Sequence, residues 1–460
     1  MRLLCLSIFL LLGTGPIIAQ QVLDQYINTA LNSNISLQQK ALSYEQSLAA
    51  LEEAKALFFP KISVQARYSV ARGGRTIDLP LGDLFNPVYN NLNLLNGVNQ
   101  ATIPDYPVTT DFPEIENEAI NFLRETEHET TLRLTMPVYN AAILKNRQIK
   151  RDQVGIEKMS VEIYKRELVN EVKKGYFNYL NANQALELFQ QTLLLVEENL
   201  RTSQSLYKNH KVTIDVVYAA EAEVKRIEQQ IAASERDRYT AQAYFNFLLN
   251  RDYQAAIEVA ESAMESNSVA SIDAARAQAQ QQREELVQLN QYLGLADKGI
   301  ELEKNTLLPQ VNLVADYGFQ GTQYTFGQED DFFLGSLVMS WTLFDRTRSP
   351  RIQQARIDRM ILEQRKAETS QQIGLAVVNA FYDLRAAEKS IEFATKEVES
   401  TGKAYQLVAK KFAQGQANLV ALTNARTEKT NAELKKIIAQ YDWQIKQAAL
   451  ERAMGTYPLK

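Results

Sequence analysis

Residues that could do chemistry are few in this sequence and lie far apart. His128 and His210 are its two histidines, and Cys5, its one cysteine, lies in an apolar N-terminal run. A zinc or copper site needs several such ligands at short spacing, so the sequence predicts no metal site. The adjacent acids Glu197 and Glu198 fall on the expected exposed face of a helix, which favours solvated charge over an acid–base pair. Since there is no phosphate-binding glycine loop either, we expect no enzyme and no cofactor.

The sequence is instead organised around one long helical stretch and its recurrence. No proline occurs from Ala141 to Lys208, so we predict a single helix of roughly 100 Å at about 1.5 Å per residue. Apolar residues recur there every seven positions, and the same pattern returns 205 positions later. The matching sets are Val172, Tyr179, Leu186, Leu193, Leu200 and Tyr207, then Val377, Leu384, Ile391, Val398, Tyr405 and Phe412. The period of seven predicts left-handed coiled-coil packing, and the shared register predicts a duplicated chain.

The N-terminus has the pattern of an export signal. Residues 1–19 carry Arg2, then an apolar run, and we predict a signal peptide that is cleaved near Ala19 or Gln20. No later run of about eighteen apolar residues offers a membrane-spanning helix. The formal net charge is −5 and the sequence has no basic cluster, so nucleic acid is not an expected partner.

Each half of the chain predicts the same order of elements: helix, strand, outer loop, strand, long helix, tight turn and helix. We place the first repeat at 20–250, an acidic connector at 251–272 and the second repeat at 273–460. The first repeat is expected to contain a helix at 21–58, strands at 62–70 and 132–138 around a long irregular outer loop at 71–128, and helices at 141–208 and 213–249. The second is expected to contain a helix at 272–306, strands at 311–319 and 333–343 around a short outer loop at 320–331, and helices at 350–413 and 418–454.

The predicted strands alternate between an apolar and a polar face. The polar face carries Lys61, Ser63, Gln65, Arg67, Arg133, Thr135, Asn312, Asp316, Ser336 and Ser340. An antiparallel sheet in lipid must close on itself, because lipid cannot hydrogen-bond an unpaired edge. Four strands are too few to close a barrel, so several chains must contribute, with cyclic symmetry. The predicted fold class is therefore mainly α with membrane β-strands, in two structural repeats of long coiled-coil helices and β-hairpins around a polar pore.

The most specific motif of the sequence is the stretch Phe412–Ala425, which reads FAQGQANLVALTNA. It resembles the periplasmic turn of the TolC-like outer membrane efflux proteins, and Tyr207–Asp215 resembles that turn more weakly. The order of elements is similar to that family over the whole mature chain. The resemblance implies a homotrimer that forms a twelve-stranded β-barrel in outer-membrane lipid and an α-helical tunnel in the periplasm. It also implies an outer-membrane export duct that passively conducts cargo delivered by an inner-membrane transporter and a periplasmic adaptor, in a tripartite efflux pump or a type I secretion system.

The closed tip of the implied tunnel departs from some members of the family. Those members carry aspartates six and nine positions after the turn glycine, whereas here Gly415 is followed at these positions by Ala421 and Asn424. An acidic gate is therefore not expected, and apolar and polar packing takes its place. Our candidate tip residues are His210, Lys211, Asp215, Gly415, Asn418, Ala421 and Asn424. We expect Asp215, Asn418 and Asn424 to line or brace the aperture.

Two further groups of residues are expected at the ends of the strands. Pro60, Pro137 and Pro309 mark predicted helix–strand junctions. Four aromatic residues are expected in a girdle at the membrane interface, with plain packing inside the sheet as the alternative: Tyr68, Tyr317, Phe333 and Trp341.

Two other functions stay open from the sequence. A periplasmic coiled-coil scaffold or adaptor without a channel would use the long helices but has no need of the paired alternating strands. An outer-membrane receptor or adhesin would use the loop at 71–128 as its binding surface.

Overall fold

The computed structural model describes residues 15–108, 110–259, 271–324, 327 and 329–459. Most of the predicted signal peptide and half of the acidic connector lie outside these residues. The chain divides into a helical unit, residues 1–54, 145–304 and 347–460, and a strand unit, residues 55–144 and 305–346. Each unit therefore draws on both predicted repeats, which are repeats of sequence rather than separate compact bodies.

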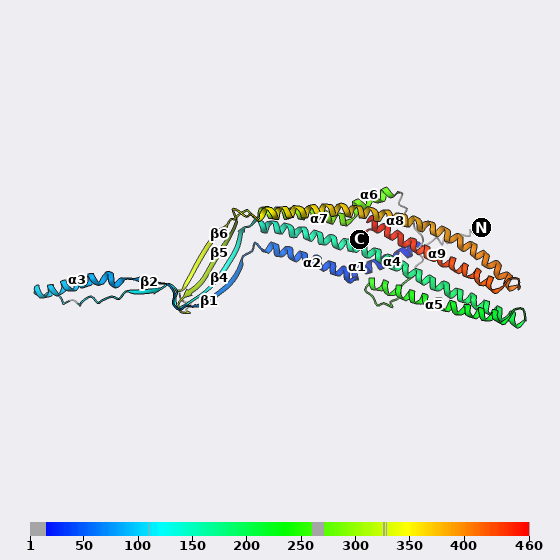
Figure 1. The fold of residues 1–460 in the computed structure, drawn as a ribbon, viewed down its shortest axis with the longest axis horizontal. Coiled ribbons are helices and arrows are strands. Elements are labelled where there is room, and N and C mark those ends of the chain that lie inside the picture. The colour runs from blue at the N-terminus through cyan, green and yellow to red at the C-terminus, as the bar shows by residue number, and fades with distance from the viewer. Residues whose placement is uncertain (1–14, 109, 260–270, 325–326, 328, 460) are drawn as a thin grey trace, which may run out of the picture. The chain divides into compact units, whose positions relative to one another are not determined.

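The helical unit consists mainly of long helices at the places that the heptad pattern predicts. They are α1 (Gly15–Ser33), α2 (Ile35–Ala56), α4 (Ala141–Lys208), α5 (Ile214–Leu248), α6 (Ile272–Gln282), α7 (Glu284–Asn305), α8 (Arg348–Ala413) and α9 (Leu419–Met454) (Figure 1). The predicted bounds of α4, α5, α8 and α9 are confirmed to within two residues. The ends of α4 and α8, and the starts of α5 and α9, each differ by the same 205 positions that relate the heptads.

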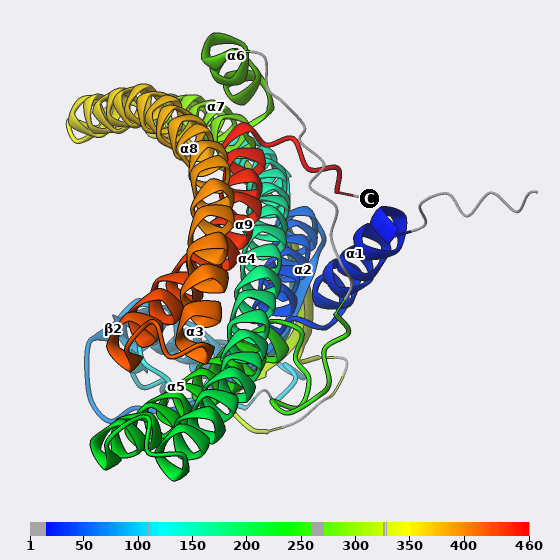
Figure 2. The ribbon, with the colours of Figure 1, turned by 90° about the vertical axis from the view of Figure 1, so that its right-hand side faces the viewer.

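The long helices pack in pairs, α4 against α5 and α8 against α9, as both ribbon views show (Figure 1 and Figure 2). Leu193 and Leu200 of α4, two of the repeated heptad positions, pack against a buried cluster of Val196 with Val224 and Ile227 of α5. In the second pair, Val377 of α8 is fully buried in a cluster that includes Trp443 of α9. Apolar burial stabilises such contacts by roughly 25 cal/mol per Å². The repeated heptad positions are therefore the seams of the two hairpins.

The continuous helices predicted at 21–58 and 272–306 are wrong, because each is broken by a polar residue. Asn34 separates α1 from α2, and its Nδ2 donates to the carbonyl of Leu248 at the end of α5 (2.9 Å). Arg283 separates α6 from α7, and its Nη1 donates to the carbonyl of Ala453 at the end of α9 (3.1 Å). The two breaks are equivalent, because Leu248 and Ala453 also lie 205 positions apart. Each break satisfies a helix-end carbonyl that would otherwise have no partner.

The strand unit contains a four-stranded antiparallel sheet within the described residues. Its strands are β1 (Lys61–Val70), β4 (Thr126–Tyr139), β5 (Gln310–Gly321) and β6 (Asp331–Ser340), in the order β1-β4-β5-β6. The predicted strand at 333–343 is wrong at its end, since β6 stops at Ser340. Trp341 lies beyond β6 and donates from Nε1 to the carbonyl of Leu307 (2.9 Å).

The register of the sheet separates apolar from polar side chains. Apolar residues face each other across the strands: Ile62 with Leu134, Leu132 with Tyr317, and Leu313 with Leu337. Side chains alternate between the two faces of a strand, so the neighbouring positions form the opposite, polar face. Arg67 pairs there with Glu129 (2.9 Å), and Arg133 pairs with Asp316 (2.8 Å). The predicted two-faced sheet is confirmed.

The prediction of an irregular loop at 71–128 is wrong over much of its length. This segment contains the ribbon of β2 (Thr76–Leu79) and β3 (Glu118–Asn121), with the helix α3 (Leu81–Thr102) between them. The sequence hides α3 because asparagine has a low helix propensity and because Pro87 and Gly97 lie inside it. His128, which we placed in the loop, is a buried residue of β4.

Over the ranges given above, no helix is both long enough and apolar enough to cross a membrane. The same residues contain no group of three or more histidine, cysteine, aspartate or glutamate side chains placed to hold a metal ion.

Candidate functional site

The α4–α5 turn and the α8–α9 turn have the same backbone geometry. His210, two residues after the end of α4, has a φ of 53°, and Gly415, two residues after the end of α8, has a φ of 73°. The two turns are closed by matching backbone bonds: His210 N–H to Tyr207 C=O (2.9 Å) and Lys211 N–H to Leu206 C=O (2.9 Å), then Gly415 N–H to Phe412 C=O (2.9 Å) and Gln416 N–H to Lys411 C=O (2.8 Å). This Schellman pattern satisfies carbonyls at a helix end. The left-handed conformation costs a non-glycine residue such as His210 roughly 1 kcal/mol.

The helices that follow the turns begin differently. Thr213 and Asn418 precede α5 and α9 in the same extended conformation, with φ of −86° and −84°. The Asn418 Oδ1 accepts a hydrogen bond from the Ala421 N–H (2.8 Å), whereas the Thr213 side chain makes no such bond. An N-cap bond of this kind satisfies one of the free amides at a helix start. Asn418 therefore has a structural role in the turn.

A cleft of about 120 Å³ lies between the two turns. Its lining is Leu206, Lys211, Val212 and Val216 from the first turn, with Phe412, Gly415, Ala417, Asn418 and Leu419 from the second. Lys211 is the charged residue of this lining, and most of the others are apolar. The two turns thus contact each other mainly through apolar side chains.

The structure brings some of the predicted tip residues together and leaves others outside the cleft. Lys211, Gly415 and Asn418 line it. The remaining candidates are exposed on the turns or at the starts of α5 and α9: His210, Asp215, Ala421 and Asn424. Asp215 lies in the first turn of α5, where the positive end of the helix dipole stabilises a carboxylate.

A buried ion pair behind the turns was not predicted. Arg426 of α9, with 2% of its side chain exposed, pairs with Glu223 of α5, which also accepts a bond from Arg226 (2.5 Å). Burial lowers the pKa of Arg426 to about 10, so its guanidinium stays charged at neutral pH. In the structure, Arg426 lies at four-residue spacing between the buried Leu422 and Thr430, on the buried face of α9. A charged residue on the buried face of a helix requires a partner.

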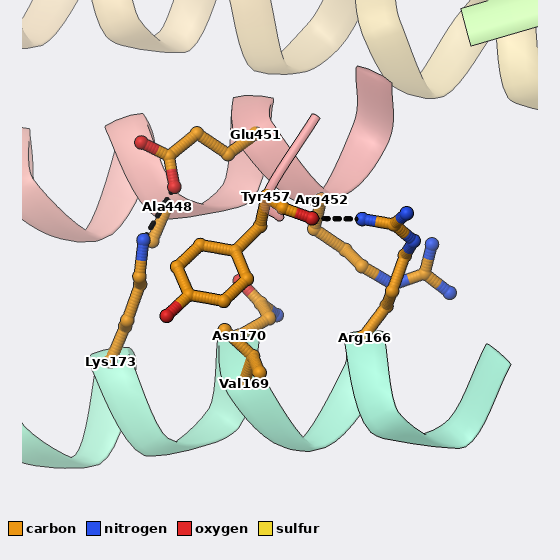
Figure 3. A pocket seen from close by; sticks show the side chains of 8 residues that line it. All are labelled: Arg166, Val169, Asn170, Lys173, Ala448, Glu451, Arg452 and Tyr457. Carbon is orange, nitrogen blue, oxygen red and sulfur yellow. Dashed lines mark hydrogen bonds and ion pairs between the residues drawn. The ribbon is translucent and has the colours of Figure 1, made fainter. Parts of the chain in front are cut away.

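A second charged cluster holds the C-terminal segment against α4 (Figure 3). Arg166 donates to the carbonyl of Tyr457 (2.5 Å), and Lys173 pairs with Glu451 (2.5 Å). The Lys173 ammonium also lies 4.5 Å from the centre of the Tyr457 ring. The cavity among these residues measures about 10 Å³, which is roughly the space for one water molecule. This cluster is a packed joint and has no room for a substrate.

Glu285, at the start of α7, joins three helices beside this cluster. Its carboxylate accepts bonds from Arg283 (2.8 Å) and from Arg452 of α9 (2.8 Å), and Arg452 also pairs with Glu167 of α4 (3.0 Å). Burial opposes the ionisation of Glu285, but the two arginine hydrogen bonds outweigh it and lower the pKa of this carboxyl to about 2. Glu285 is therefore a permanent anion at neutral pH that links the two repeats.

The predicted junction and interface residues lie at the ends and on the apolar face of the sheet. Pro60 and Pro309 directly precede β1 and β5, and Pro137 lies at an irregularity in the β4–β5 register. The girdle candidates are all exposed: Tyr68, Tyr317 and Phe333 on the strands, and Trp341 just after β6. Tyr317 and Phe333 are direct partners in the register. His128 is stacked on Tyr324, with the ring centres 4.5 Å apart.

Part of the sequence is similar to a known family of outer membrane proteins. Residues 268–456 match the family model described as outer membrane efflux protein. No curated protein sequence matches the chain. Because the matched residues cover the second repeat, the sequence likeness is concentrated where the turn motif Phe412–Ala425 lies.

Solved channel structures have the same fold over nearly the whole chain. The outer membrane channel CmeC of Campylobacter jejuni is 13% identical, with a TM-score of 0.74 over 95% of this chain and 86% of that one. VceC, an outer membrane protein of Vibrio cholerae, is 13% identical, with a TM-score of 0.72 over 95% and 98%. The MtrE outer membrane channel of Neisseria gonorrhoeae, in its open state, is 16% identical, with a TM-score of 0.71 over 94% and 89%. The resemblance to the TolC-like outer membrane efflux proteins is confirmed.

Proposed function

We propose, from the match of residues 268–456 to the outer membrane efflux protein family and from the fold of the whole chain, that this protein is an outer-membrane export duct. It conducts passively the cargo that an inner-membrane transporter and a periplasmic adaptor deliver, as part of a tripartite efflux pump or a type I secretion system. The strand unit is the part that spans the outer membrane, and the helical unit is the part that extends into the periplasm.

The observation that carries this proposal is the two-faced sheet. Its apolar face is exposed, as at Val64, Phe333 and Leu337, while the opposite face holds the Arg133–Asp316 ion pair. Such a sheet suits lipid on one side and a water-filled pore on the other. A scaffold without a channel would have no use for an exposed apolar sheet face, so this alternative is disfavoured.

The two outer edges of the sheet indicate how the barrel closes. Within the described part of the chain, β1 and β6 are the terminal strands of the sheet. An open edge cannot persist in lipid, so strands of other copies must pair with both. Three copies, the number that the family resemblance implies, supply twelve strands and leave no edge.

The paired turns are the part of the helical unit that is suited to a gate. Their contact is apolar around a small cleft, and long helix pairs can move as rigid bodies between two arrangements. We assign Asp215, Asn418 and Asn424 to the lining or bracing of this tip. For Asp215, the expected result of Asp215→Ala is a changed single-channel conductance and a weaker block by cations; unchanged conductance and block would remove Asp215 from the aperture.

The proposal is tested by the mass and shape of the mature protein extracted from membranes in detergent. Light scattering should give the mass of a trimer, and electron microscopy should show a helical shaft on the order of 100 Å, the length set by the rise of α4. A monomer or dimer that stays in solution without detergent would exclude the barrel.

A further inference from the structure

The helix α3 turns two of its asparagines, Asn86 and Asn93, toward the returning segment and leaves apolar residues exposed elsewhere on its surface. On its inner side, Asn86 exchanges two hydrogen bonds with the backbone of Ile115, at 2.8 and 2.9 Å. One heptad later, Asn93 exchanges two with the backbone of Phe112, at 3.0 and 2.8 Å. These side chains bind the returning segment as a neighbouring strand would. Asn86 and Asn93 are therefore occupied by contacts within the chain.

The outer side of α3 carries a seam of apolar residues that is exposed in the single chain. Leu84, Val88, Leu95 and Val98 are each exposed by 50% or more. Together with Leu81 they repeat at the alternating three- and four-residue spacing of a coiled coil, Leu81-Leu84-Val88-Asn91-Leu95-Val98. We call these six residues the α3 seam. An exposed apolar face of this kind on a helix indicates a contact with another protein surface.

The chemistry of the α3 seam fits a second copy of itself. In a symmetric association each residue meets its own equivalent, so a charged seam would repel itself. The one charged residue of α3 is Asp83, which accepts a bond from Asn117 on the returning segment (3.2 Å) and is outside the seam. The polar member, Asn91, has both a donor and an acceptor and satisfies another Asn91. An apolar partner would leave its amide unpaired.

We propose that α3 packs in parallel against the α3 of neighbouring copies in the same assembly, through the α3 seam. This inference rests on the proposed function, because the open edges of β1 and β6 are what bring the copies together around one axis. The insertion between β1 and β4 then forms a helical bundle at the end of the barrel, with Asn91 setting its register. The shorter connection between β5 and β6 contains no such helix in its described residues.

Cysteine cross-linking tests the proposal in the full-length protein in outer membranes. With Cys5→Ala, the chain has no other cysteine, so Val88→Cys gives one thiol on the seam and Asn90→Cys gives an exposed thiol on the opposite side of the helix. Oxidation of the Val88→Cys protein should produce disulfide-linked dimers of the chain. At most two of every three chains can be cross-linked, because a trimer has three thiols and one disulfide uses two of them. Asn90→Cys should stay at the level of the protein without cysteine, and Leu95→Cys should repeat the result of Val88→Cys.

The outcomes separate this inference from the proposed function. A particle with the mass of a trimer in which Val88→Cys and Leu95→Cys cross-link no more than Asn90→Cys would overturn the α3 contact and leave the duct intact. Cross-links from the seam to a different protein would also overturn it. A chain that forms no oligomer in detergent would overturn the duct itself.

Discussion

The two repeats of this chain share one backbone and differ in the residues that hold it. His210 and Asn250 lie just after the long helices of the first repeat, Gly415 and Gly455 lie just after those of the second, and all four residues have positive φ. Glycine adopts this conformation without strain, asparagine tolerates it, and histidine adopts it at a cost. The same turn therefore forms with a favourable and with an unfavourable residue. The packing of the helix pairs, rather than the local sequence, decides where the first repeat turns.

Among the contacts between the two repeats, the buried ion pair between Glu223 and Arg426 should contribute most to the stability of the turns. Glu223→Gln leaves the Arg426 guanidinium buried without a counter-charge, which we expect to cost about 3 kcal/mol. Because the pair joins α5 of one repeat to α9 of the other, both turns should open more often. Amide hydrogen exchange of the detergent-solubilised protein should rise by roughly a hundredfold in residues 206–222 and 411–427.

An exposed ion pair on the same helix is the matched control for this change. Glu228 pairs with Lys225 on the surface of α5, with exposed side-chain fractions of 45% and 75%. Glu228→Gln should change the opening free energy by less than about 0.5 kcal/mol. Equal exchange rates in the two variants would mean that the Glu223–Arg426 pair does not hold the turns together.

The second expected effect concerns Glu285 and depends on pH. The carboxylate contributes stability because its pKa falls from 4.5 to about 2 on folding. That contribution is complete above pH 4.5 and is lost as the pH falls from 4.5 towards 2. Glu285→Gln should lower stability at pH 7 by about 1.5–3 kcal/mol, the range for hydrogen bonds to a charged group.

Thermal unfolding followed by circular dichroism at several pH values checks this prediction. The melting temperatures of the wild type and of Glu285→Gln should converge below pH 4.5, since protonation removes the same charge from the wild type. A difference that stays constant from pH 7 to pH 3 would assign the loss to packing instead of charge.

Most of the helical framework could be predicted from sequence, for a physical reason. The heptad seams of α4 and α8 repeat over many turns, so the prediction draws on dozens of residues that agree. The breaks at Asn34 and Arg283 could not be predicted, because each depends on one side chain that reaches a carbonyl far away in the sequence. Similarly, α3 is hidden by asparagines whose partners lie on the returning segment.

The candidate site was predicted less completely than the fold. The turn residues are marked by local sequence, and Gly415 and Asn418 were found in this way. The apolar lining of the cleft and the Glu223–Arg426 pair join residues from both repeats, so no local pattern reveals their contact. The burial of Arg426, which requires a charged partner, is seen only in the structure.

Substitutions at His210 and Gly415 should change the stability of the two turns by about 1 kcal/mol. His210→Gly should stabilise the first turn by about that amount, because the left-handed conformation is then free of strain. Gly415→Ala should destabilise the second turn by a similar amount, although nothing lies within 4 Å of the added methyl group. Local hydrogen exchange of each turn measures both changes. An unchanged or more stable turn in Gly415→Ala would show that this backbone position is not strained for other residues.

The smallest expected effect distinguishes the two helix starts. Asn418→Ala removes the bond to the Ala421 amide and should cost about 0.5–1 kcal/mol, whereas Thr213→Ala should cost only a few tenths, since Thr213 makes no such bond. Thr213→Asn should then stabilise α5, because its backbone already has the conformation in which Asn418 caps α9. Exchange rates of the amides in the first turns of α5 and α9 report each change separately. If Thr213→Ala and Asn418→Ala prove equally costly, the cap bond is not what distinguishes the two helix starts.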